Sequence, residues 1–182
     1  MKGASGQAFT TPAELTRYPA PGFQDRLAAG GSRLAGEGPE AEAAFSAFAE
    51  AAARLSGGEL EELYTRSFDM NPACALELGW HLYGERYERG AFLVDMRRRL
   101  AEHGIAETRD LPDHLSHALE LLGRMGDDEA GPFAREKVLP AVRKLTGALK
   151  GKDEPYHSAL LAVEAVLTRR FEPPARAAGG QR

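Results

Sequence analysis

The sequence is poor in cysteine and in isoleucine. Cys74 is the only cysteine among 182 residues, which excludes an internal disulfide and a four-cysteine zinc site and favours a reducing compartment. Ile105 is the only isoleucine, and valine is also scarce. Because strands prefer β-branched side chains, this composition leaves little from which to build a sheet. Alanine, leucine, glutamate and arginine dominate instead, and they favour helices.

Long apolar runs and an excess of positive charge are missing as well. No stretch reaches the ~18 uninterrupted apolar residues of a membrane span. Residues 1–9 carry one lysine and no apolar run, so they do not resemble a signal peptide. The formal net charge of -4 disfavours nonspecific nucleic-acid binding. We therefore expect a cytoplasmic protein with no membrane span and no nucleic-acid partner.

Familiar catalytic motifs do not occur in the sequence. There is no Walker lysine loop, no G-x-G-x-x-G after a strand and no G-x-S-x-G elbow. A position at the start of a helix could lower the pKa of Cys74 and activate its thiol. The apolar residues around Cys74 favour a buried core position instead. These motifs therefore give no sign of catalytic chemistry.

Apolar residues recur at helical spacing along most of the chain, and prolines and glycines mark the breaks. This pattern predicts an all-α fold, a single compact bundle of about seven to nine helices over residues 1–172. Residues 173–182 are small and polar, and we expect a disordered tail there. The expected helical segments are 11–17, 23–34, 40–55, 59–67, 71–84, 86–103, 110–122, 132–150 and 155–170.

Local signals set several of these boundaries. Thr11, Pro12 and Glu14 match a capping box, and Asn71 before Pro72 predicts a helix start by the same logic. Residues 123–131 are expected to form an acidic, glycine-containing connection. Proline lacks an N–H, so Pro140 is expected to kink or divide the segment 132–150.

The richest polar row is Asp113, His117 and Glu120. On a helix these three side chains share one face at i, i+4 and i+7, where they could ligate a metal ion. The plainer interpretation gives Asp113 a capping role at the helix start, where a carboxylate favours the helix dipole, and gives one histidine a hydrogen bond to a neighbouring helix. The prediction is no metal, and a metal-binding helical bundle that uses these three residues remains the alternative.

Aromatic and polar side chains also crowd two neighbouring segments, residues 64–72 and 80–85. Ordinary core packing is the plainer interpretation of this cluster. The other interpretation is an apolar groove with a few polar groups, which is how proteins hold an extended or helical peptide.

These segments carry a family resemblance. The matching positions are Tyr64, Phe68 and Asp69, then Leu76, Leu78, His81, Tyr83, Gly84 and Glu85, then Arg89 and Gly90, and finally Leu111-Pro112-Asp113-His114-Leu115. The series resembles the NarJ branch of the TorD family, the molybdenum-cofactor assembly chaperones of respiratory nitrate reductase and related enzymes. The run 15–19 also resembles the opening helix of that branch. The likeness covers about residues 11–125; Gly79 and Trp80 depart from it, and the chain after Gly126 matches nothing recognisable.

The resemblance implies an all-helical fold and a function without catalysis. It implies that the partner is the catalytic subunit of a molybdoenzyme, nitrate reductase or a relative, whose N-terminal segment is bound in the cytoplasm. The subunit is held open until its bis-molybdopterin guanine dinucleotide is inserted, and docking or export waits until then. The chaperone itself keeps no stably bound cofactor, and molybdenum-cofactor biosynthesis proteins are a further expected partner.

On this resemblance we expect a client-binding groove between segment 64–85 and helix 111–122. Apolar pockets are expected near Tyr64, Phe68, Leu82, Leu115 and Leu119, beside Tyr83. Basic client residues would face Asp69, Glu85, Asp113 and Glu120, and hydrogen bonds would come from His81, His114 or His117. A bundle that only mediates oligomerisation is a third possibility, and a large apolar patch closed by self-association would favour it.

Overall fold

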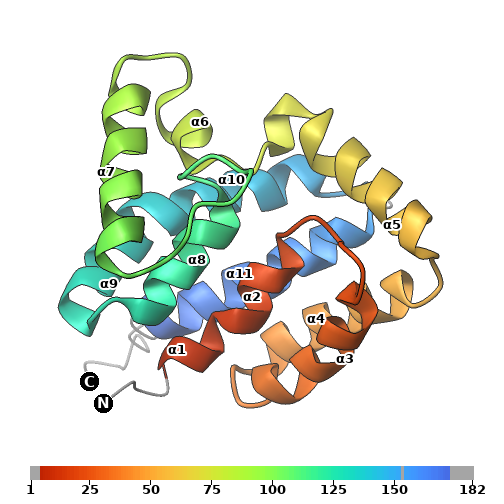
Figure 1. Ribbon diagram of the computed structural model, residues 1–182. Helices are drawn as coiled ribbons and strands as arrows, with labels where there is room; N and C mark the ends of the chain where they lie inside the picture. The colour runs from red at the N-terminus through yellow and green to blue at the C-terminus, as the bar shows by residue number, and fades with distance from the viewer. Residues whose placement is uncertain (1–4, 153, 173–182) are drawn as a thin grey trace, which may run out of the picture.

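The computed structural model of the chain describes residues 5–152 and 154–172, and these residues are almost entirely helical (Figure 1). The α-helices are α1 (Ser5–Ala8), α2 (Thr10–Leu15), α3 (Phe23–Leu34), α4 (Pro39–Ala52), α5 (Gly57–Tyr64), α6 (Leu78–Tyr83), α7 (Glu88–Glu102), α8 (Leu115–Arg124), α9 (Asp127–Phe133), α10 (Leu139–Leu149) and α11 (Pro155–Phe171). Two π-helical turns, η1 (Thr65–Asp69) and η3 (Ala134–Val138), and one 3₁₀ turn, η2 (Pro72–Cys74), complete the chain. No strand occurs within the described ranges, so the all-α prediction is confirmed.

The longest helix, α11, packs against α4 and α10 and anchors the hydrophobic core. Its Tyr156 is completely buried and lies against Phe48 of α4, with ring centroids 5.1 Å apart. Removing a large apolar side chain from water stabilises a fold by about 1.5–3 kcal/mol. In Figure 1, α2 and α8 cross the middle of the molecule, and α6 and α7 lie at the upper left, where α6 contacts α10.

The start of the chain folds differently from the predicted capping box. Helix α2 begins at Thr10, and its N-cap is Phe9, which has no capping side chain. Thr11 is buried, and its hydroxyl donates to the carbonyl of Gly30 in α3. The capping-box prediction at Thr11 was therefore wrong, because packing of α2 on α3 takes this side chain into the core.

A capping box does exist at the start of α5. Ser56, which lies between the expected helical segments 40–55 and 59–67, is the N-cap of α5. Its hydroxyl accepts from the N–H of Glu59, and the Glu59 carboxylate accepts from the N–H of Ser56 at 2.8 Å. This reciprocal pair satisfies two N–H groups that a helix start leaves open.

The predicted helix start at Asn71 was also wrong. Residues 72–74 form only the turn η2, residues 75–77 are extended, and α6 does not begin until Leu78. An isolated antiparallel bridge between Glu77 and His114 holds the extended stretch. This pairing partner lies far along the chain, so a local capping signal could not reveal it.

The segment 123–150 is divided more finely than expected. Residues 127–131, which were predicted to belong to the connection, lie in the helix α9, whose first turn carries three acidic side chains. The single long helix is interrupted by η3, and α10 starts with Pro140 in its first turn. Pro132 and Pro140 each lack an N–H donor, so the ladder of hydrogen bonds changes between them.

Several other expectations are confirmed. Helix α3 spans 23–34 as predicted, and α11 extends the prediction by one residue to Phe171. Gly104 follows α7 with φ of +64°, the left-handed conformation expected of a residue that ends a helix. The predicted tail, 173–182, lies outside the described residues. No helix in the described part of the chain is long and apolar enough to cross a membrane.

Candidate functional site

The motif Leu111 to Leu115 crosses the front of the molecule and pairs with residues 76–78. Leu78 donates its N–H to the Asp113 carbonyl at 3.0 Å, and Leu115 donates to the Leu76 carbonyl at 2.8 Å. These two hydrogen bonds align the N-terminus of α6 with the N-terminus of α8. This short bridge therefore joins the starts of the two helices.

Asp113 caps α6 from across this bridge. Its Oδ2 accepts from the N–H of Gly79 at 2.8 Å, which satisfies an N–H of the first turn of α6. Burial raises the pKa of Asp113, while the Gly79 N–H and the Arg89 cation oppose that rise. The capping role suggested by the sequence is thus correct in kind, but the capped helix is α6 and not the helix that follows Asp113.

Gly79 is glycine because Asp113 leaves no room for a side chain. A Cβ at this position would lie 2.7 Å from Asp113 Oδ2 and 3.1 Å from Phe92. The beginning of α6 therefore approaches the carboxylate closely. The glycine that departs from the family pattern has a packing reason.

His114 caps the second helix. Its Nδ1 accepts from the N–H of Ser116 at 3.3 Å, which places the imidazole proton on Nε2, toward the hydroxyl of Tyr64. Tyr64 in turn donates to the carbonyl of Thr16 at 3.2 Å, at the end of α2. Burial lowers the pKa of His114 to about 4, so the imidazole is neutral at pH 7. This chain of contacts ties α8, α5 and α2 together.

Most predicted site residues are buried around this bridge and not open to a partner. Tyr64, Phe68, Asp113, His114, Leu115, His117 and Leu119 are all buried. His81, Leu82, Tyr83 and Glu120 are half-buried, and only Asp69 and Glu85 are exposed. The seven buried residues are therefore part of the core of the fold.

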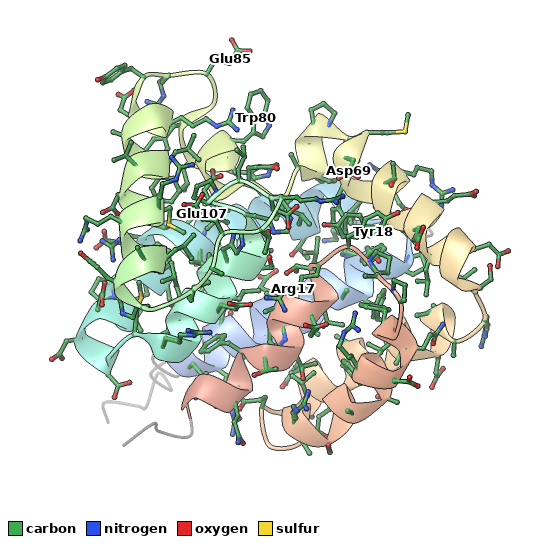
Figure 2. All side chains as sticks on the ribbon, viewed as in Figure 1. Arg17, Tyr18, Asp69, Trp80, Glu85 and Glu107 are labelled. Atoms are coloured by element: carbon green, nitrogen blue, oxygen red, sulfur yellow. The ribbon has the colours of Figure 1, made fainter. Side chains whose placement is uncertain are left out.

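The half-buried residues have local partners. His81 Nε2 donates to the Ala75 carbonyl, and burial lowers the pKa of His81. The Tyr83 hydroxyl accepts from Lys137 at 2.9 Å, and Leu82 packs against the core. Glu85 lies at the outer tip between α6 and α7, apart from Asp69, as Figure 2 shows. The predicted site residues therefore do not line one common groove.

The alternative metal triad is not assembled. Asp113 binds Gly79, His117 contacts the Leu111 carbonyl at 3.0 Å and the Thr108 hydroxyl at 3.2 Å, and Glu120 forms an ion pair with Arg17. Within residues 5–152 and 154–172, no group of three His, Cys, Asp or Glu side chains is placed to hold a metal ion. The geometry gives no support to the metal-binding alternative.

Aromatic rings lead from the core to the surface beside the bridge. Tyr64 lies in edge contact with Phe68 and Tyr156, with centroids 5.0 and 5.7 Å away, and with Tyr18 at 5.4 Å. Tyr18 is 45% exposed, whereas the other three are buried. Its hydroxyl donates to Glu61 at 3.1 Å. Tyr18 therefore forms the outer end of a rigid aromatic cluster.

The carboxylates of Glu61 and Asp69 lie near this exposed ring, and Asp110 lies near Asp69 and Glu77. We call Glu61, Asp69, Glu77 and Asp110, together with Tyr18 and the exposed Leu111, the acidic face. Arg17, Tyr18 and Asp69 lie near the middle of the view in Figure 2, with Trp80 above them.

The carboxylates of the acidic face act on one another. Burial raises the pKa of Asp69 and of Glu77, and the neighbouring charge of Asp110 raises both further. None of the three forms an ion pair with a described residue. The nearby Arg17 is already occupied by Glu14 and Glu120. The acidic face thus presents three carboxylates without an ion-pair partner in the described residues, and the Arg89 cation acts on one of them, Glu77.

Of the residues of the acidic face, only Asp69 was predicted from the sequence to bind the client. Tyr18 had a signal, since the Tyr-Pro pair breaks a helix and leaves the ring outside a periodic pattern. Glu77 and Asp110 had none, because their approach depends on how distant segments pack. Trp80 also lies at this side, and its Nε1 donates to the Pro72 carbonyl at 2.9 Å.

Comparison with known proteins gives consistent matches. Residues 35–162 match the family described as the nitrate reductase delta subunit. The nitrate reductase molybdenum cofactor assembly chaperone NarJ of Escherichia coli (strain K12) is 32% identical over 94 residues, which cover 51% of this chain and 39% of that protein. The probable nitrate reductase molybdenum cofactor assembly chaperone NarW of the same strain is 32% identical over 92 residues, 50% of this chain and 39% of NarW. The chain therefore spans about two-fifths of the length of the curated relatives it matches.

Proposed function

The chain belongs to the nitrate reductase delta subunit family, and we propose that it is an assembly chaperone for the catalytic subunit of a molybdoenzyme. On this proposal it acts in the cytoplasm and binds the N-terminal segment of that subunit before membrane docking or export. The bis-molybdopterin guanine dinucleotide is inserted into the client, and the chaperone catalyses no reaction. The printed names of NarJ and NarW, which describe nitrate reductase molybdenum cofactor assembly, support this role.

The acidic face is the observation that carries the binding part of the proposal. Its unpaired carboxylates suit lysine and arginine side chains, and the exposed ring of Tyr18 suits an apolar anchor. Phe68, Leu115 and Leu119, near which apolar pockets were predicted, are buried side chains of the core. A client segment with basic residues beside an apolar one would match this arrangement.

Neutralising two carboxylates of the acidic face tests the proposal. Asp69→Asn with Asp110→Asn is expected to weaken binding of a synthetic client N-terminal peptide about three- to tenfold, because exposed ion pairs contribute ~0.2–1 kcal/mol each. Calorimetric titration measures the dissociation constant. For the unaltered protein, raising the salt from 0.05 to 0.5 M should also weaken binding.

The matched control removes the same charge elsewhere. Glu50→Gln with Asp128→Asn changes two exposed carboxylates on α4 and α9. This control should bind the peptide like the unaltered protein. Equal affinities for the two double variants would show that the acidic face does not bind the client. Substitutions at the buried Phe68 or Asp113 would test folding and are unsuited to this purpose.

A further inference from the structure

A second surface feature lies between α4 and α11. It is a groove of about 500 Å³ that shares no residue with the acidic face. Its walls include Glu40 and Ala44 from α4 and Leu161, Glu164, Ala165 and Arg169 from α11. The groove lies on the two helices that pack most extensively in the fold, so its shape is set by rigid elements.

The floor of this groove is apolar and shallow. Leu161 is 38% exposed, which is unusual for a leucine on the core helix. Ala44 and Ala165 are small and half-buried beside it. Small residues in the trough between two helices let a third helix approach closely and lay its ridge of side chains into the groove.

The two helices run in opposite directions along the groove. Glu37, just before α4, pairs with Arg170 near the end of α11, and Phe48 of α4 packs on Tyr156 near the start of α11. A straight trough between antiparallel helices fits a helical partner better than an extended one. An extended segment would gain no backbone hydrogen bonds there, because the backbone groups of α4 and α11 bind within their own helices.

Carboxylates from both walls border the apolar floor. Glu40 has no ion-pair partner in the described part of the chain. Glu164 meets Arg143 only at 3.5 Å, and Arg143 makes its shorter contact, 2.8 Å, with Glu172. Arg169 supplies one positive charge to the lining. The balance along the groove is negative, so basic residues on the partner are favoured.

We propose that this groove binds an amphipathic helix of a partner protein, with an apolar stripe on Leu161, Ala44 and Ala165 and with lysine or arginine side chains beside Glu40 and Glu164. The proposal stands independently of the client and of the acidic face. A second copy of this chain fits less well. Its exposed apolar side chains there are Tyr87, just before α7, and Val94 on α7, but the flanking Arg97 and Arg98 are already paired with acidic residues of α7 and the following segment.

Two synthetic peptides test the groove. Both are amphipathic helices of about five turns with the same leucine stripe, and they differ only in carrying lysine or glutamate beside it. Fluorescence anisotropy should show that the lysine peptide binds and that Ala165→Arg weakens it at least about tenfold, a change of ~1.4 kcal/mol. Glu40→Lys with Glu164→Lys should reverse the preference between the peptides.

Control variants separate this site from others. Ala101→Arg adds the same side chain to the exposed side of α7 and should leave binding unchanged, as should Glu50→Gln with Asp128→Asn. Circular dichroism checks that each variant is folded. The proposal is overturned if neither peptide binds or if both bind equally. It is also overturned if Asp69→Asn with Asp110→Asn weakens binding of the lysine peptide and Ala165→Arg does not. Self-association that Ala165→Arg abolishes in sedimentation would overturn it in favour of a second copy.

Discussion

Replacing Asp113 with alanine is expected to lower the free energy of unfolding by roughly 2–3 kcal/mol. The substitution removes the oxygen that accepts from the N–H of Gly79 at 2.8 Å, and that donor is buried. It also takes away the negative charge that faces Arg89. Urea unfolding followed by circular dichroism measures the loss, which should appear as a lower midpoint with an unchanged slope.

The conservative variant separates capping from charge. Asp113→Asn keeps an oxygen that can accept from Gly79, so its cost should be smaller than that of the alanine variant. A midpoint for Asp113→Ala equal to that of the unaltered protein would contradict the capping role. Equal losses for asparagine and alanine would assign the effect to the charge.

Gly79→Ala is expected to lower the free energy of unfolding by about 1–3 kcal/mol, although alanine is the better helix former. The added Cβ would lie 2.7 Å from Asp113 Oδ2 and 3.2 Å from Arg89 Cγ. Either the cap on α6 breaks or the bridge between residues 76–78 and 113–115 shifts. Thermal and urea unfolding measure the effect.

Gly90 in α7 provides the matched control, because a Cβ there meets no atom within 4 Å. Gly90→Ala should raise stability by up to about 1 kcal/mol through helix propensity alone. In a double-mutant cycle, Gly79→Ala should cost less when Asp113 is already alanine, since the clashing oxygen is gone. Strict additivity of Gly79→Ala and Asp113→Ala would contradict the close approach seen here.

The fold class was accessible from the sequence because it depends on periodicity. Helices α3 and α11 present unbroken apolar spacing between proline and glycine breaks, so their limits were predicted closely. The stretch 75–77 was not, because hydrogen bonds of Leu76 and Leu78 to residues 113–115 hold it out of the helix. Local capping signals cannot report a partner almost forty residues away.

The site was less accessible, and the reason lies in the motif itself. The Leu111 to Leu115 run marks the family correctly, yet its polar side chains, Asp113 and His114, are buried caps of two helices. A family resemblance does not distinguish residues that hold the fold from surface residues that bind a partner. The acidic face needs the three-dimensional proximity of Tyr18, Asp69 and Asp110, which come from three distant parts of the sequence.

Site-specific photocrosslinking tests the central claim most directly. Tyr18 is replaced by p-benzoylphenylalanine, and the protein is irradiated with the full-length catalytic subunit of the proposed client before cofactor insertion. Tyr87, a second exposed tyrosine at the N-cap of α7, provides the control position. The proposed function predicts that position 18 crosslinks to the N-terminal segment of the client and that position 87 does not. Crosslinks from position 87 alone, or none from position 18, would contradict it.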